Sequence, residues 1–319
     1  MNFEDFLKIH RYFDFYNFIK KDKSQTLYQK IRRGIVILLH QRKKEDPREN
    51  DNKIIEFIDK ITQETVEKHI LKWNKQQKRE KTIKQKTNEF REYFERYILR
   101  KMYTRTFRLN PKEDEEKDKA LRAFFRKLSF IKPKHLEIPE DLVKQKGAHK
   151  ARKKLQEINN AKNPHDKIER ICESCNQINK ILDRANMNGA DSFFPFFIYQ
   201  VLHANPLNIH SNIEYILRFK NSNLLSMTQA GYYFTNFSSA VRFLENLTAQ
   251  QVLMSQEEFE NHMNQIKSEE NEPKYLFENV PLEKLNIRDL RDILLEYKKI
   301  ALENEELKGI LQKKQLKQK

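Results

Sequence analysis

Glycine, proline and cysteine are all scarce in this sequence, and each shortage excludes something. With only 5 Gly and 9 Pro among 319 residues, few positions are suited to ending a helix, so long helices are predicted. The two cysteines, Cys172 and Cys175, are too few for a disulfide framework. No run of about eighteen apolar residues occurs, so no transmembrane helix is expected.

The first residues, MNFEDFLKIHRYF, carry acidic side chains. They lack the basic and then apolar layout of a secretory signal peptide. Together these absences predict a soluble protein of the cytoplasm.

Aromatic side chains and positive charge are abundant. The 22 Phe and 12 Tyr, with 38% apolar residues overall, are typical of a globular chain, because disordered chains are poor in aromatic residues. The net charge of +16 would suit nucleic acid, an anionic membrane or an acidic protein partner. A general background rich in Lys and Asn would give the same charge, so charge alone does not choose a function.

Almost every periodic segment is typical of an amphipathic helix, and no segment shows the alternation of a strand, so the fold class is predicted to be all-α. One apolar stripe at a spacing of three to four comprises Phe90, Phe94, Tyr97, Ile98 and Met102. Three polar stretches, 41–52, 110–119 and 132–147, are interpreted as loops or connectors. A last long helix is expected at 281–319, where Ile293, Ile300 and Leu307 recur every seven residues.

The most informative segment is 163–252. Its first helix places Cys172 and Cys175 on an apolar stripe, which favours buried core cysteines over a zinc site because no second ligand pair exists. Asp191 and Ser192 are then expected to open a mostly buried helix, with Pro195 in its first turn. At this point Asp191 can be interpreted either as an ordinary N-cap or as a functional carboxylate.

A later helix contains the sequence GYYFTN. Tyr233, Phe237, Ala240, Val241 and Leu244 form its apolar stripe. Helical spacing leaves Tyr232, Thr235, Asn236 and Ser239 together on the neighbouring face. This face is either an edge that binds a partner or a solvated surface, and periodicity does not separate the two.

Several stretches in this part of the chain resemble one family. They are NPHDKIERICESCNQI, GADSFFPFFIYQVLHANP, SNIEYILRF and GYYFTNFSSAVRFLENL. They resemble the Vps-nine domains of the Rabex type, which are exchange factors for Rab-five-like GTPases. Weaker matches extend back through FERYILRKMYTRTF and KALRAFFRKLSFIKPKHLEIP. The resemblance implies an N-terminal helical bundle at 1–106, packed on an all-helical exchange domain at 107–268, with a C-terminal linker and helix at 269–319.

The resemblance also implies a function. The chain would be a guanine-nucleotide exchange factor that promotes GDP release from a Rab-five-like GTPase, without covalent chemistry, cofactor or metal. Asp191 would be the catalytic acid, called an aspartate finger, and Pro195, Tyr232, Thr235 and Asn236 would bind the GTPase. Aromatic residues between the two helices would form a groove for its switch regions. The protein would be cytoplasmic and recruited to early endosome membranes as a peripheral protein, and its C-terminal helix could bind a coiled-coil adaptor.

Two alternatives remain from other classes. The chain could be a scaffold that binds an endosomal Rab protein without accelerating exchange. A basic nucleic-acid-binding protein is disfavoured, because the aromatic residues follow core periodicity and are not free to stack on bases, so no nucleic-acid partner is expected. There is no P-loop, GxSxG or dinucleotide motif to support a hydrolase or redox enzyme. The zinc-finger cysteines that accompany ubiquitin binding in Rabex-type proteins are missing, so ubiquitin binding is not inferred.

Overall fold

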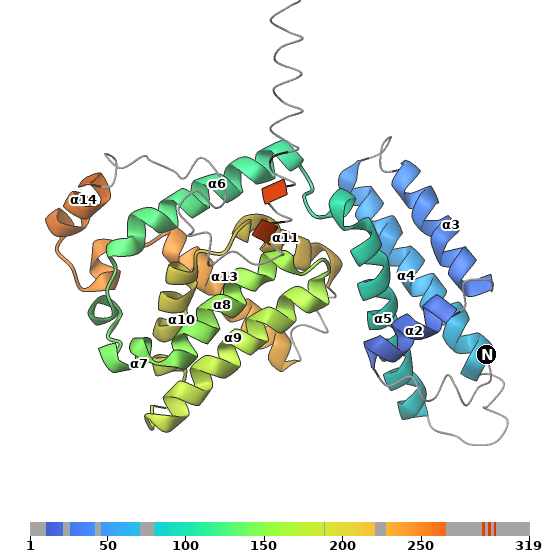
Figure 1. The fold of residues 1–319 in the computed structure, drawn as a ribbon, viewed down its shortest axis with the longest axis horizontal. Coiled ribbons are helices and arrows are strands. Elements are labelled where there is room, and N and C mark those ends of the chain that lie inside the picture. The colour runs from blue at the N-terminus through green and yellow to red at the C-terminus, as the bar shows by residue number, and fades with distance from the viewer. Residues whose placement is uncertain are drawn as a thin grey trace, which may run out of the picture. The chain divides into compact units, whose positions relative to one another are not determined.

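The computed structural model describes residues 11–21, 26–41, 46–70, 80–187, 189–220 and 228–265, together with 289–290, 293–294 and 297. Within these residues every regular element is a helix, which confirms the all-α prediction (Figure 1). The α-helices are α2 (Tyr12–Lys21), α3 (Thr26–Gln41), α4 (Pro47–Ile70), α5 (Glu80–Thr106), α6 (Pro111–Lys127), α7 (Glu140–Lys144), α8 (Lys146–Gln156), α9 (Pro164–Arg184), α10 (Ala190–Ala204), α11 (Ile209–Phe219), α13 (Gln229–Glu245) and α14 (Gln256–Gln265). Short 3-10 turns are η1 (Leu128–Phe130), η2 (Pro133–Leu136), η3 (Glu157–Asn160) and η4 (Ala249–Val252).

Helices α2 to α5 form a bundle around an aromatic core (Figure 1). Phe15 of α2 is fully buried, and its ring lies 5.0 Å from that of Phe94 and 6.0 Å from that of Phe90, both in edge-to-face geometry. Such pairs favour one packing arrangement beyond the burial of area. The stripe predicted on α5 is buried along its whole length, because its spacing keeps one face of the helix toward the bundle.

Helices α6 to α13 form the second layer of helices, which we call the α6–α13 region. Its centre is α9, which packs against α8, α10, α11 and α13. Helix α10 is apolar on nearly all sides, and Phe196, Phe197 and Val201 are completely buried in it. A helix without a polar face must be enclosed by its neighbours, so α10 is fixed on several sides.

Polar contacts join the bundle to the α6–α13 region. Arg218 of α11 pairs with Asp51 of α4 and donates to the backbone carbonyls of Thr106 and Phe107 at the end of α5. Tyr215, one turn earlier on α11, is completely buried in the core of the bundle. The two parts therefore share one core as well as an ion pair, in agreement with the predicted packing of a bundle on a helical domain.

The three predicted loops are shorter than expected. Helix α4 already begins at Pro47 and α6 at Pro111, because proline suits the first helical position, where its missing N–H has no partner to lose. Asp118, in the charged stretch 110–119, is buried and accepts hydrogen bonds from Ser211. The stretch 132–147 contains η2 and α7 and the start of α8, so it is folded and not a plain connector.

The C-terminal part is only partly described. Helix α14 is capped at its N-terminus, because the Ser255 hydroxyl accepts a hydrogen bond from the Glu258 amide at 3.2 Å. By packing, the chain divides into Met1–Phe259 and Glu260–Lys319. The predicted linker and most of the predicted final helix lie outside the described residues, and the boundaries at 106 and 268 stay predictions. None of the helices described here has the length and apolar character needed to span a bilayer.

Candidate functional site

Asp191 lies in the first turn of α10 and faces solvent. The helix begins at Ala190, with Gly189 at its N-cap in a left-handed conformation (φ 132°) that favours glycine. The N-cap interpretation of Asp191 is therefore wrong, since the helix starts earlier than the sequence indicated and Asp191 is its second residue. Among the described residues its carboxylate has no hydrogen-bond or ion-pair partner, and it is exposed.

Pro195 is not in the first turn of α10, as predicted, but in the second. Proline has no N–H, so the carbonyl of Asp191, four residues earlier, cannot receive its α-helical hydrogen bond, and the ring crowds that carbonyl. The early start of the helix explains the difference. Pro195 therefore perturbs the helix at the residue that carries the exposed carboxylate.

The polar face of α13 lies open as predicted. Thr228 caps the helix by accepting a hydrogen bond from the Gly231 amide at 3.1 Å. Tyr232 is 53% exposed, and Thr235 is also exposed. Within the described part of the chain neither hydroxyl has a hydrogen-bond partner. Asn236 is half-buried, and its Nδ2 donates to the carbonyl of Tyr232 at 3.0 Å, so part of its capacity is used within the helix.

Two ring contacts fix the relative direction of α10 and α13. The rings of Phe193 and Tyr233 lie 6.2 Å apart, and one turn later those of Phe197 and Phe237 lie 6.5 Å apart. Since both pairs advance together along the chain, the helices run parallel and in register. The first turns of both helices therefore lie at one end of the pair, which brings Asp191 to the same end as Tyr232.

The aromatic groove predicted between these helices is filled. Phe193, Phe197, Tyr233 and Phe237 are each 5% exposed or less, because they pack against one another and not against an open space. They are core residues that hold the two helices together. The accessible surface at this end of the two helices consists of the exposed Asp191, Tyr232 and Thr235 and the half-buried Pro195.

Tyr233 anchors α13 to α9. Its hydroxyl accepts hydrogen bonds from Asn179 Nδ2 at 2.8 Å and from Gln229 Nε2 at 3.1 Å. The adjacent Tyr232 has no such contact, although the two rings lie 5.7 Å apart. The ring of Tyr233 therefore packs inside the domain, whereas the ring of Tyr232 lies on its surface.

The cysteines behave as core residues. Cys175 is completely buried and Cys172 is half-buried, and both are free thiols. Burial raises the pKa of Cys172 to about 11 and that of Cys175 well above its ordinary value. Both thiols are therefore protonated at neutral pH and are poor metal ligands or nucleophiles. The prediction of a core cysteine is confirmed for Cys175, whereas Cys172 is only half-buried and lines a cavity.

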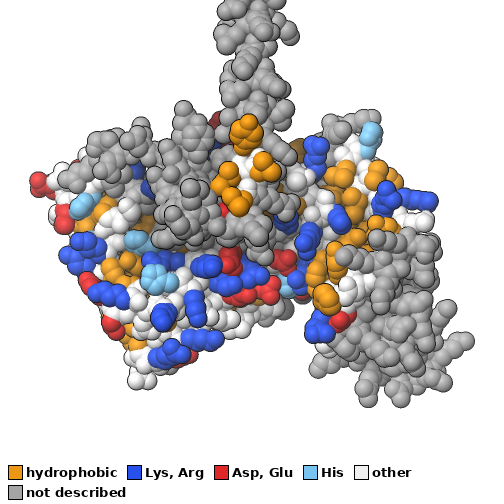
Figure 2. Space-filling view, viewed as in Figure 1, with side chains coloured by type: hydrophobic (Ala, Val, Ile, Leu, Met, Phe, Trp, Pro, Cys, Tyr) orange, Lys and Arg blue, Asp and Glu red, His pale blue; other side chains and the backbone are white. Residues whose placement is uncertain are grey.

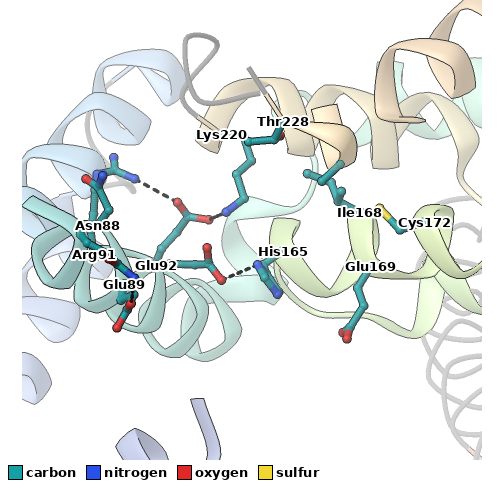
Figure 3. Close-up of a pocket in the computed structure, with 13 residues that line it drawn as sticks. Asn88, Glu89, Arg91, Glu92, His165, Ile168, Glu169, Cys172, Lys220 and Thr228 are labelled. Carbon is teal, nitrogen blue, oxygen red and sulfur yellow. Dashed lines mark hydrogen bonds and ion pairs between the residues drawn. The ribbon is translucent and has the colours of Figure 1, made fainter. Parts of the chain in front are cut away.

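A cavity of about 570 Å³ lies elsewhere, between α5 and the first turns of α9 (Figure 3). Two ion pairs line it, His165 Nδ1 with Glu92 Oε1 at 2.7 Å and Lys220 Nζ with Glu95 Oε1 at 2.7 Å. Each joins the bundle to the α6–α13 region. These four charged side chains are paired between the bundle and the α6–α13 region. Packing of the two parts therefore accounts for their presence in the cavity wall.

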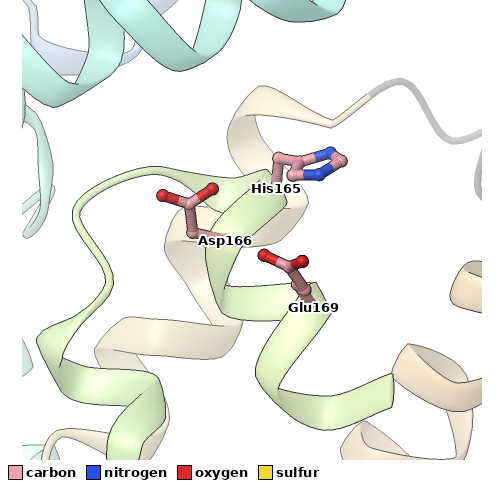
Figure 4. A group of neighbouring side chains, drawn as sticks. All are labelled: His165, Asp166 and Glu169. Atoms are coloured by element: carbon pink, nitrogen blue, oxygen red, sulfur yellow. The ribbon is translucent and has the colours of Figure 1, made fainter. Parts of the chain in front are cut away.

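Three potential metal ligands, His165, Asp166 and Glu169, lie together at the start of α9 (Figure 4). Asp166 is already committed, because its carboxylate accepts from Arg96 at 2.7 Å and from the Asn163 amide group at 2.6 Å. His165 is paired with a glutamate, as described above. The cluster is explained by these structural contacts, and we assign no metal to it.

Lys167 is a buried charge that sequence patterns did not reveal. It is completely buried on α9, and its Nζ donates to Asn212 Oδ1, Ile158 O and Tyr103 OH at 2.6, 3.1 and 3.2 Å. Its position beside the predicted apolar stripe was the only sequence signal. Sequence patterns also did not reveal that His210 Nε2 lies 3.7 Å from Asp114 Oδ1.

Residues 148–249 match the family model of the vacuolar sorting protein 9 (VPS9) domain. The chain is 34% identical over 180 residues to vacuolar protein sorting-associated protein 9A of Arabidopsis thaliana, covering 54% of this chain and 34% of that protein. It is 35% identical over 192 residues to the Rab5 GDP/GTP exchange factor of Homo sapiens, covering 59% of this chain and 39% of that protein. The matched region thus spans between a third and two fifths of those relatives. A third relative, the GTPase-activating protein and VPS9 domain-containing protein 1 of Xenopus laevis, is 28% identical over 159 residues, covering 48% of this chain and 11% of that protein.

Proposed function

We propose that this chain, which contains a VPS9 domain at residues 148–249, promotes GDP release from a Rab-five-like small GTPase. The names of its relatives support an exchange factor of this kind. The activity would act in endosomal traffic, with the protein recruited to the membrane of early endosomes. Asp191, Tyr232 and Thr235 are the residues proposed to carry it, with Pro195 and Asn236 beside them.

One observation supports this choice most. Three polar side chains, Asp191, Tyr232 and Thr235, extend from two parallel helices without a hydrogen-bond partner among the described residues. All three are exposed, so in the free protein they bond to water, which the polar groups of a partner can replace. Groups that are held on rigid helices but left free can bond to a partner with little loss of conformational entropy.

The proposed mechanism replaces the contacts that hold GDP. A small GTPase binds the phosphates through a P-loop lysine and Mg²⁺. The Asp191 carboxylate would pair with that lysine and repel the phosphates, and this weakens the Mg²⁺ site. Tyr232 and Thr235 would hold the opened switch region by hydrogen bonds. No bond of the protein is made or broken.

The size of the effect is within reach of these contacts. An exchange factor acts by binding the nucleotide-free state better than the GDP-bound state. A thousandfold acceleration requires about 4 kcal/mol of differential binding. A charge-assisted contact that forms only in the complex supplies roughly 1.5–3 kcal/mol. The two hydroxyl groups can supply most of the remainder.

Asp191 lies at the positive end of a helix dipole. The first turns of α10 and α13 lie at the same end of the helix pair, and a helix N-terminus carries a partial positive charge from its free amides. A carboxylate in the first turn is therefore stabilised by the helix that presents it. Asn or Ala at this position would remove the charge that the mechanism needs.

The test is release of a fluorescent GDP from a Rab-five-like GTPase, with wild-type protein, Asp191→Ala and Asp183→Ala. Asp183 is a matched control because it is an exposed aspartate at the end of α9. We expect acceleration by the wild type and by Asp183→Ala, and a loss of about 100-fold in Asp191→Ala, as for removal of a preorganised electrostatic group. Thr235→Ala and Tyr232→Ala should each lose less.

The outcomes separate the exchange factor from the scaffold. Binding of the GTPase without acceleration, across a panel of Rab proteins, would favour the scaffold. Equal activity in wild type and Asp191→Ala would show that another residue carries the reaction. Asp191→Ala should keep its melting temperature, because the side chain has no contacts to lose and exposed substitutions change stability by about 0.5 kcal/mol or less.

A further inference from the structure

A second polar hollow, of about 350 Å³, opens where the first turn of α8 meets the last two turns of α9. Its floor is formed by Gly147 and Ile181. A Cβ atom on Gly147 would lie 3.0 Å from two side-chain carbons of Ile181, so glycine lets the two helices approach closely without displacing that side chain. The polar side chains that line the hollow are Gln145, Lys146, Lys150, Gln177, Lys180 and Arg184.

The charge of this hollow is all of one sign. Lys146 and Lys150 are four residues apart on α8, and Lys180 and Arg184 are four residues apart on α9. Each pair therefore projects from one face of its helix, and both pairs border the same hollow. All four side chains are exposed, and in the described residues none of them forms an ion pair or hydrogen bond through its side chain.

This arrangement opposes folding unless an anion offsets it. Like charges four residues apart on a helix repel each other, and no acidic residue lines the hollow. Elsewhere on the same helices lysines and arginines do have partners, for example Lys154 with Glu157 and Arg170 with Glu173. The unmatched charge is thus a local feature and not only a consequence of the net charge of +16.

The start of α8 adds to the positive potential. The helix has eleven residues, and its N-cap, Gln145, makes no side-chain hydrogen bond to the first turn. The amide of Ala148 donates to the carbonyl of Gln145 at 3.0 Å, so among the described residues only the amides of Lys146 and Gly147 lack a backbone acceptor at the start of the helix. These two residues border the hollow and carry the partial charge of a helix N-terminus. Figure 2 shows several Lys and Arg side chains on the part of the surface where α8 and α9 lie.

We propose that this hollow, the α8–α9 basic pocket, binds the phosphorylated head group of an anionic lipid. The small volume suits a compact group with clustered phosphates. An extended acidic protein segment would instead need apolar anchors, because protein interfaces depend on buried aromatic and aliphatic residues, and Ile181 is the only large apolar residue in the lining. Lysine and arginine side chains bind phosphate oxygens by charge-assisted hydrogen bonds.

The pocket is close in the chain to the site of the proposed function. Arg184 ends α9, and only the turn before α10 separates it from Asp191. A lipid head group bound there would hold the exchange site at the membrane surface. This consequence rests on the proposed exchange function, whereas binding of the head group does not.

The experiment is vesicle flotation with the full chain. Three compositions are compared: phosphatidylcholine alone, phosphatidylcholine with phosphatidylserine, and phosphatidylcholine with phosphatidylinositol bisphosphate at the same total charge. The variant is Lys150→Gln with Lys180→Gln. The matched control is Lys60→Gln with Lys112→Gln, which removes the same charge from exposed lysines of α4 and α6.

We expect the wild type to bind the phosphoinositide vesicles more tightly than the phosphatidylserine vesicles. The pocket variant should lose about 30-fold in affinity for the phosphoinositide vesicles, from the typical contribution of two lysines near an anionic surface. The control variant should lose much less on those vesicles. Free inositol bisphosphate should compete with the vesicles for the wild type.

Three results would overturn the proposal. One is equal loss in the pocket variant and the control, which would assign binding to the overall charge. Another is binding of free inositol bisphosphate without any vesicle binding, which would assign the pocket to a soluble phosphate. The third is a phosphopeptide that binds the pocket more tightly than the phosphoinositide vesicles do.

Exchange measured in solution keeps the two proposals apart. The pocket variant should retain wild-type exchange when no vesicle is present, which also shows that it is folded. Asp191→Ala should bind vesicles as the wild type does. Failure of the exchange function alone would therefore leave vesicle binding intact, and failure of the lipid proposal would leave exchange in solution intact.

Discussion

Lys167 allows a test of how this fold holds a buried cation. It is completely buried, and its Nζ has three acceptors, of which Asn212 Oδ1 is the nearest at 2.6 Å. The rings of Tyr103 and Phe107 lie with their centroids 5.1 and 5.0 Å from Nζ. These contacts join α5, α9, α11 and η3, so the protonation state of one side chain affects the packing of four elements.

The stability of the protein should therefore depend on pH through this residue. Burial lowers the pKa of Lys167 from 10.5 to about 7, because the charged form loses its hydration. The unfolded chain keeps its ordinary lysine pKa. Between these two values the unfolded state binds more protons than the folded state, so the free energy of unfolding rises as the pH rises.

The magnitude follows from the slope of one proton. A full difference of one bound proton changes the free energy of unfolding by about 1.36 kcal/mol per pH unit. Between about pH 8 and about pH 9 nearly the whole difference applies, so we expect a gain of about 1.3 kcal/mol. For roughly 250 ordered residues this raises the melting temperature by about 2–3 °C.

The measurement is thermal unfolding of wild type and Lys167→Met at both pH values. Methionine has a similar length and no charge at any pH, so other titrating groups cancel in the difference between the two proteins. Lys153→Met, at an exposed position on α8, controls for the loss of a lysine. Parallel pH dependence of wild type and Lys167→Met would refute the reasoning, because it would mean that the three acceptors keep the buried lysine charged.

Two further substitutions test contacts near the candidate site. Gln200 of α10 is completely buried, and among the described residues neither its Nε2 nor its Oε1 has a hydrogen-bond partner. Gln200→Met should therefore raise the free energy of unfolding by about 1–2 kcal/mol, and a lower melting temperature would show that the amide is satisfied after all. Tyr233→Phe removes the hydroxyl that accepts from Asn179 and Gln229 and should cost about 1 kcal/mol, and urea denaturation with an unchanged midpoint would contradict that anchoring role.

Periodicity was sufficient for the helices and for their buried faces. The stripe from Phe90 to Met102 and the stripe from Tyr233 to Leu244 are buried as predicted, because the spacing of apolar residues alone fixes which side of a helix avoids water. The same spacing placed Tyr232 and Thr235 on an open face, and this was correct. The role of these residues came only from the resemblance to a family and stays a prediction.

The wrong predictions concern a carboxylate that is held by a distant part of the chain and a helix that begins earlier than its sequence indicates. Asp118 belongs to a charged run that was interpreted as a loop, but its carboxylate is enclosed because it caps α11 through Ser211. No local pattern reveals a partner so distant in the chain. Pro195 was predicted to lie in the first turn because aspartate, the residue at position 191, is a favoured N-cap residue. The positive φ of Gly189 instead allows α10 to begin earlier.

In the candidate site, the residues that fix the two helices differ from the residue that supplies the carboxylate. The rings of Phe193 and Tyr233, together with those of Phe197 and Phe237, fix the two helices. Within the described residues the Asp191 side chain has no hydrogen bond or ion pair. A substitution in the ring pairs would move the polar groups and lower stability and exchange together. Loss of the Asp191 carboxylate removes a charge from a surface that is otherwise unchanged. If exchange fell in proportion to stability across both kinds of variant, packing alone would explain the activity, whereas a fall confined to Asp191 would assign it to the carboxylate.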